Sequence, residues 1–119
     1  MRILTFKREE INLLEFDYLK QYEDENFIIN FEDCKLKNLL IDADNVSGLS
    51  FYNCCLKNCK LVSNNTKVYI NGSTLVDSEI NSDLKEGHSC IEIDVSTIRN
   101  CNINEKKYVR NCVKFEQNI

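Results

Sequence analysis

Apolar residues recur at every fifth position through the middle of the chain. The unbroken series consists of Phe31, Leu36, Ile41, Val46, Phe51, Leu56 and Leu61. A period of five matches neither the 3.6-residue repeat of an α-helix nor the two-residue repeat of a flat strand. It predicts a coil of short extended segments that turns a corner once in every five residues.

Two further sets of residues follow the same period. Small or apolar residues lie two positions before the series, among them Cys34, Leu39, Cys54 and Cys59. Turn-forming residues lie two positions after it, among them Asp33, Asn38, Asn53 and Asn58. Residues two apart share a face of an extended segment, so the first set should point inward with the apolar series. Asn and Asp suit the corners because they tolerate left-handed backbone and bond their own chain.

Four corners would close one turn of the coil in twenty residues. Residues twenty apart should then lie on adjacent coils, with Phe31 against Phe51 and Leu36 against Leu56. Adjacent coils would be about 4.8 Å apart and hydrogen-bonded like parallel strands. Stability would pass from each coil to its neighbours.

The pattern over residues 29–61 resembles that of the pentapeptide-repeat proteins, which form right-handed quadrilateral β-helices. The resemblance implies an all-β solenoid of this type. The pattern returns, interrupted, with the inner residues Ile70, Leu75, Ile80, Ile93, Ile98 and Ile103. Asp44 departs from it by placing a carboxylate where an inward residue belongs. We expect Asp44 to accept hydrogen bonds from backbone N–H groups at a corner.

We predict one domain in which residues 29–103 form the coils. Residues 1–28 would be an N-terminal cap containing a helix over residues 7–22, although Phe6, Ile11 and Phe16 also fit the five-residue period. Residues 104–119 would be a C-terminal cap or an edge that pairs with a second copy. The nine-residue step from Leu61 to Ile70 predicts one tightened corner, and residues 81–89 are interpreted as a loop.

The 119-residue chain has a net charge of −4. This mild acidity argues against direct nucleic-acid binding through a basic surface. No apolar run approaches a membrane span, and the N-terminus lacks a signal-peptide core. We therefore expect a soluble, cytoplasmic protein without membrane association.

The seven cysteines are expected to be reduced thiols that fill the core. In the five-residue register Cys34, Cys54, Cys59 and Cys101 point inward, and Cys55 points outward. A zinc site formed by Cys55, Cys59, His88 and Cys90 is the less favoured alternative, because no CxxC motif is present. We expect no metal and no cofactor.

No catalytic constellation is apparent, so we expect no enzyme. The function favoured by the pattern is a protein-binding module, such as an inhibitor, immunity or regulatory protein. Five clustered carboxylates form the candidate surface for a basic partner: Glu23, Asp24, Glu25, Glu32 and Asp33. Two alternatives remain. The resemblance implies a possible DNA mimic that binds a type II topoisomerase, and open coil ends would suit a structural or assembly protein, including a homodimer.

Overall fold

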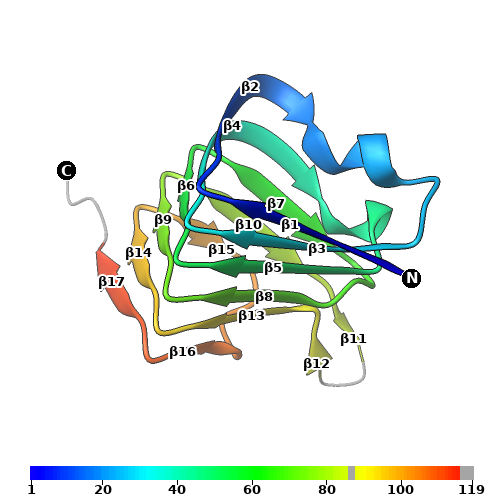
Figure 1. Cartoon of the computed structure of the whole chain (residues 1–119). Coiled ribbons are helices and arrows are strands. Elements are labelled where there is room, and N and C mark those ends of the chain that lie inside the picture. Colours follow the sequence, from blue (N-terminus) through cyan, green and yellow to red (C-terminus); the bar gives the residue numbers. More distant parts are fainter. Residues whose placement is uncertain (86–87, 116–119) are drawn as a thin grey trace.

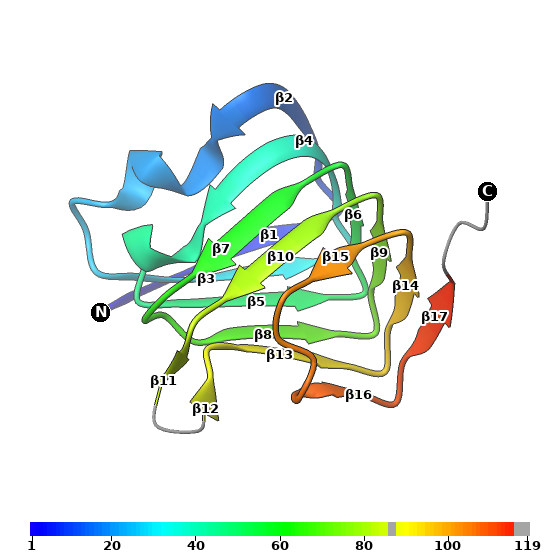
Figure 2. The same ribbon diagram turned by 180° about the vertical axis from the view of Figure 1, so that it is seen from behind.

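The computed structural model describes residues 1–85 and 88–115, and in them the chain winds into a stack of coils (Figures 1 and 2). Each coil has four sides, which we number in chain order. Short parallel strands form sides 1, 2 and 3, and turns form side 4. The fold is a parallel β-solenoid of about five turns, as the five-residue period predicts.

Side 1 is a six-stranded sheet. Its strands lie down the stack in the order β1 (Arg2–Lys7), β3 (Phe27–Glu32), β5 (Gly48–Tyr52), β8 (Val68–Asn71), β13 (Ile91–Asp94) and β16 (Val109–Arg110). Phe31 pairs with Phe51, twenty residues later, which confirms the predicted stacking. Phe51 pairs with Ile70, only nineteen residues later, which confirms the tightened corner.

Sides 2 and 3 share a nine-stranded sheet that bends around one corner. β2 (Glu10–Asp17) and β4 (Lys35–Asp42) are long enough to cross the bend. Side 2 continues with β6 (Cys55–Lys57), β9 (Thr74–Val76), β14 (Thr97–Arg99) and β17 (Val113–Phe115). Side 3 continues with β7 (Lys60–Ser63), β10 (Glu79–Ser82) and β15 (Asn102–Ile103). Leu36 pairs with Leu56 on side 2, again as predicted.

Side 4 is made of turns in the described part of the chain. It contains two 3-10 helices, η1 (Tyr18–Tyr22) and η2 (Ala43–Asn45). Residues 81–89 were predicted to be a loop, and residues 86–87 of that range lie outside the described residues; strands occupy much of the rest. β10 extends to Ser82, and an antiparallel hairpin follows, formed by β11 (Leu84–Lys85) and β12 (His88–Ser89). This hairpin lengthens its coil to 23 residues, measured from Val68 to its partner Ile91.

The helix predicted over residues 7–22 is wrong. Residues 10–17 form β2, which pairs with β4, and only η1 follows it. The five-residue period governs this segment: Ile11 pairs with Leu36, and the Phe6 ring stacks on Phe31. Pairing with β4 satisfies the backbone and partly buries Ile11, which outweighs the helical spacing. The first coil therefore begins at Arg2, which pairs with Phe27.

The interior of the solenoid is filled by side chains. Each of the thirteen residues predicted for the core is at most 7% exposed. The rings of Phe6, Phe31 and Phe51 form a stack with 5.2 Å between successive centroids. Every buried side-chain nitrogen and oxygen in the described residues has a hydrogen-bond partner. Apolar side chains thus occupy the interior in the part of the chain that the structure describes.

Left-handed residues turn the corners on either side of side 2. Asp33 and Asn53 lie between sides 1 and 2 with φ of 55° and 52°, and Asn38 and Asn58 lie between sides 2 and 3 with φ of 58° and 52°. Their side chains form ladders between coils, in which Asn53 Nδ2 donates to Asp33 Oδ1 at 2.6 Å and Asn58 Nδ2 donates to Asn38 Oδ1 at 2.8 Å. The predicted role of these four residues is confirmed. Val95 also has a left-handed φ of 52°, which is unusual for a β-branched residue.

Candidate binding surface

The five candidate carboxylates do not form one patch. Glu23, Asp24 and Glu25 lie in the turn before β3, whereas Glu32 ends β3 and Asp33 follows it. A six-residue strand is about 20 Å long, so β3 holds the two groups apart.

Glu32 and Asp33 are already engaged within the protein. Glu32 Oε2 lies 3.7 Å from Lys7 Nζ. Asp33 Oδ1 accepts the hydrogen bond from Asn53, and its backbone turns the corner. These two residues therefore stabilise the end of side 1.

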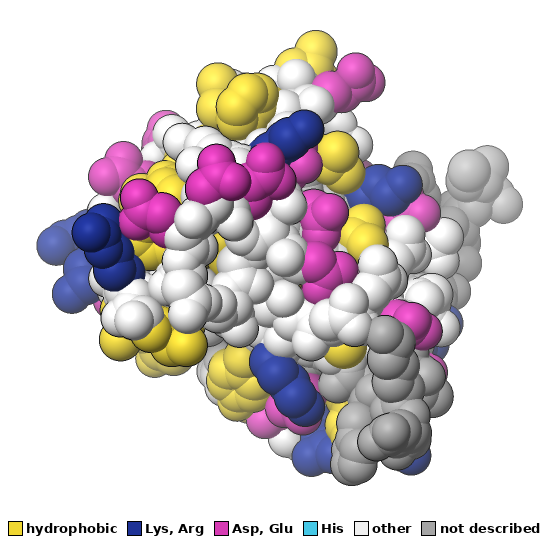
Figure 3. All heavy atoms as spheres, turned by 90° about the vertical axis from the view of Figure 1, so that its right-hand side faces the viewer, with side chains coloured by type: hydrophobic (Ala, Val, Ile, Leu, Met, Phe, Trp, Pro, Cys, Tyr) yellow, Lys and Arg dark blue, Asp and Glu magenta, His cyan; other side chains and the backbone are white. Residues whose placement is uncertain are grey.

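Glu23, Asp24 and Glu25 line a hollow of about 350 Å³ on side 4. Its opposite rim consists of residues 44–47, next to η2. Arg2 Nη1 lies 3.0 Å from Glu25 Oε2, but the ion pairs among the described residues include none to Glu23 or Asp24. Figure 3 views the molecule from this side, where acidic side chains gather across the face. We call this the acidic hollow.

Asp44 anchors the far rim of the acidic hollow. Its Oδ2 accepts the backbone N–H of Asn64 at 2.8 Å, and its Oδ1 accepts those of Asn65 and Thr66 at 2.8 and 2.9 Å. Burial acts to raise the pKa of Asp44, but these hydrogen bonds outweigh it and lower the pKa below its usual value. The expected bonding to backbone N–H groups is confirmed. Asp44 does not point inward, however, because Ala43 takes the buried position.

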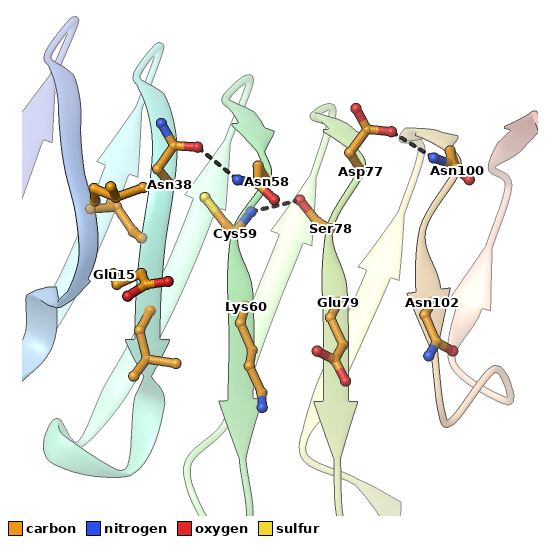
Figure 4. A pocket seen from close by; sticks show the side chains of 13 residues that line it. Glu15, Asn38, Asn58, Cys59, Lys60, Asp77, Ser78, Glu79, Asn100 and Asn102 are labelled. Atoms are coloured by element: carbon orange, nitrogen blue, oxygen red, sulfur yellow. Dashed lines mark hydrogen bonds between the residues drawn. The ribbon is translucent and has the colours of Figure 1, made fainter.

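A second hollow runs along the corner between sides 2 and 3 (Figure 4). It has a volume of about 870 Å³ and is lined by the ladder of Asn38 and Asn58, by Asp77, and by Lys60 and Glu79 on side 3. These groups can hydrogen-bond a polar ligand. The charged groups of the lining are the carboxylates of Glu15, Asp77 and Glu79 and the ammonium group of Lys60. Cys59 Sγ and Ser78 Oγ, which also line it, donate to backbone carbonyls. The corner asparagines were the sequence signal for this groove, and the five-residue period assigned them only a structural role.

Side 2 carries a basic column that we did not predict. Lys37 lies beside Lys57 in the pairing of β4 with β6, and Arg99 lies further along the same side on β14. Lys35 Nζ is 3.8 Å from Glu10 Oε1. Side 2 is therefore not an acidic face of the solenoid. The twenty-residue spacing of Lys37 and Lys57 is the sequence signal for their pairing.

The cysteines follow the predicted register closely. Cys34, Cys54 and Cys59 are buried, Cys55 is half-buried, and so is Cys101, which was expected inside. Cys54 Sγ donates to the carbonyl of Phe31 at 3.3 Å. Burial raises the pKa of Cys54 to about 11 and also raises that of Cys59.

The zinc alternative places its residues on different sides. Cys55 begins β6 on side 2, and Cys90 immediately precedes β13 on side 1. The His88 side chain lies outside the described part of the structure. Among the described residues, no group of three or more His, Cys, Asp or Glu side chains is arranged to hold a metal ion.

The fold defines the class as a parallel β-solenoid. Comparison of the chain with protein-family models, with curated proteins and with solved structures gives no match. No helix in the described residues is both long and apolar enough to span a membrane.

Proposed function

We propose that the chain is a non-enzymatic β-solenoid of the pentapeptide-repeat type that binds a basic protein through its acidic hollow. An inhibitor, immunity protein or regulator would act in this way. One observation carries the proposal: Glu23 and Asp24 are exposed carboxylates without an ion-pair partner among the described residues, on the rim of a hollow. A solenoid with a filled core acts through its outer surface.

The turn that presents these carboxylates is fixed by the backbone. The N–H groups of Glu23 and Glu25 donate to the carbonyls of Lys20 and Tyr22, each at 3.2 Å. Phe27 N donates to the carbonyl of Glu25 at 3.0 Å. Asp44 holds the opposite rim to the next coil. Because both rims are ordered before binding, association would lose little conformational entropy.

The chemistry of the hollow favours lysine and arginine side chains. Glu23 and Asp24 would attract them over a distance of roughly one Debye length, about 8–10 Å at physiological salt. Asn26, Asn45 and Ser47 line the same hollow and supply neutral hydrogen-bonding groups. The partner we propose is therefore a protein with an exposed basic segment.

DNA mimicry has less support. A protein that imitates duplex DNA would need carboxylates along the length of one side. Here Lys37 and Lys57 are stacked on side 2, and Glu32 and Glu25 are paired with Lys7 and Arg2. Glu15 in β2 and Glu92 in β13 are also exposed and outside the ion pairs of the described residues, but only the hollow groups several carboxylates in one turn, which favours a protein partner.

Two steps test the proposal. A photo-crosslinking residue at Asn26 should capture a partner that the same residue at Thr74, on side 2, does not. With that partner, Glu23→Lys combined with Asp24→Lys should lower the association rate about tenfold or more and flatten its salt dependence. Glu79→Lys with Glu92→Lys makes the same change of net charge elsewhere and should have a much smaller effect. Equal losses from the two pairs would contradict binding at the hollow.

A further inference from the structure

Among residues 1–85 and 88–115, β1 at the N-terminal end of the solenoid pairs with β3 alone, so its other edge is unpaired. In a parallel pair, alternate residues of a strand bond to the same neighbour. The N–H groups of Arg2 and Arg8 donate to Asn26 O at 3.0 Å and Glu32 O at 2.9 Å, on the β3 side. The backbone groups of Ile3, Thr5 and Lys7 therefore point away from β3, toward the open end.

In the described part of the chain, β17 presents a second strand edge, at the C-terminal end of the solenoid. Val113 N donates to Ser96 O at 3.0 Å, and Asn100 N donates to Phe115 O at 2.8 Å, so both residues bond toward β14. Lys114, between them, directs its backbone groups the opposite way. A small cavity of about 30 Å³, lined by Ile98, Ile103 and Phe115, reaches the core at this end.

Exposed apolar side chains gather at the same two ends. Of ten large hydrophobic residues exposed in the described chain, seven lie in the first coil or in β17: Met1, Ile3, Leu13, Leu14, Phe16, Val113 and Phe115. A solenoid that ended in solvent would be expected to carry polar side chains there. The ends are therefore suited to cover one another.

The charges of the two ends are opposite. Residues 1–26 contain seven acidic and four basic side chains, a net charge of −3. Residues 95–115 contain five basic side chains and one acidic, a net charge of +4. Contacts between like ends would bring like charges together, whereas contacts between unlike ends would be attractive.

We propose that the chain self-associates head to tail, with β1 of one copy pairing against β16 of the next. All solenoid strands run in parallel, so this contact continues both the sheet and the strand direction. The bulge between Asn12 and Phe16 confines the pairing to β1 and the start of β2. A continued register would set Lys7 against Arg110, and their exposure keeps this repulsion small. Such a heterologous contact does not close on itself and builds open chains.

Proline at each edge tests the geometry, because its missing N–H would point outward and leave the internal ladders intact. We expect wild-type protein to associate in sedimentation-velocity experiments, more weakly as salt rises. Thr5→Pro and Lys114→Pro should each be monomeric alone. Mixed together, they should form a one-to-one dimer and nothing larger, because each retains one intact end. Thr5→Val and Lys114→Ala are the matched controls for folding and for edge chemistry.

Three results would overturn the proposal. The first is wild-type protein that remains monomeric up to about 1 mM, because a dissociation constant above that value is no tighter than that of a non-specific contact. Either proline variant could still dimerise alone, which would indicate pairing of like ends. The mixture of folded variants could stay monomeric. If a proline variant fails to fold, Lys114→Glu tests the same contact without changing the backbone, and it should weaken association at least tenfold. Glu9→Lys combined with Glu10→Lys in the other copy should then restore association.

Discussion

Replacing Asp44 by alanine should destabilise the protein markedly, and far more than replacing the exposed Asp24 by alanine. The substitution removes the acceptor for three backbone N–H groups and unties η2 from the next coil. Asn64 and Asn65 are exposed, so water can replace those two bonds, whereas Thr66 is a buried residue and its N–H is less accessible to water. Hydrogen bonds to a charged group contribute about 1.5–3 kcal/mol each when desolvated, and less when exposed. We therefore expect a loss of roughly 2–4 kcal/mol, or about 10 °C in Tm.

The effect should depend on pH in a defined direction. The folded pKa of Asp44 is lowered, so its stabilisation is present above the unfolded pKa of about 3.9 and is lost as the pH falls through the folded value. Urea denaturation of wild type and Asp44→Ala should thus show a large difference at neutral pH that shrinks below about pH 4.

Asp24→Ala is the matched control, because it removes an exposed carboxylate and should leave the unfolding free energy almost unchanged. An Asp44→Ala protein as stable as wild type would refute the reasoning. So would a difference that stays constant from neutral to acidic pH.

Three further predictions concern the core, a corner and the thiols. Leu56→Ala should cost roughly 2–5 kcal/mol in urea denaturation, because Leu56 is fully buried between Leu36 and Leu75, and a cost near zero would contradict its place in the core. Val95→Asn should stabilise the protein by about 1 kcal/mol by relieving left-handed strain, whereas Val113→Asn, at a similarly exposed strand position, should not raise Tm. Iodoacetamide with mass spectrometry should label Cys55 before Cys34, Cys54 and Cys59, and early labelling of Cys54 would argue against its burial and raised pKa.

The sequence predicts the coil well because every side has the same two local requirements, an apolar residue inside and a turn-forming residue at the corner. Residues such as Phe31 and Leu36 must be apolar to fill a narrow interior. Asn38 must adopt the left-handed backbone conformation of the corner, which most residues disfavour. Both demands recur every five residues, so a periodic reading finds them. The corner before side 4 breaks the rule. Asp42 Oδ1 accepts the N–H of Asp44 at 3.0 Å and forms a 3-10 turn, which shifts the buried position to Ala43.

The candidate site was harder to predict for two physical reasons. Closeness in sequence does not mean closeness in space along a strand, so β3 separates Glu25 from Glu32. Whether a carboxylate is free depends on partners from other coils, and Arg2 and Lys7 reach Glu25 and Glu32 only after the first coil has stacked on the second. The side chain of Val95 does not predict its left-handed φ, because valine disfavours that conformation. The pairing of β13 and β14 with their neighbouring strands holds Val95 in it.

β3 and β4 pair with β5, β6 and β7 at a spacing of twenty residues, so one coil of the solenoid corresponds to a twenty-residue segment of the sequence. A duplication of one such segment in the gene would insert a whole rung, and the rod would grow by about 4.8 Å with every side kept in line. An insertion of any other length must bulge out, as the hairpin after β10 does. Binding surfaces on such a rod can be moved apart in fixed steps while the groups that form them stay unchanged.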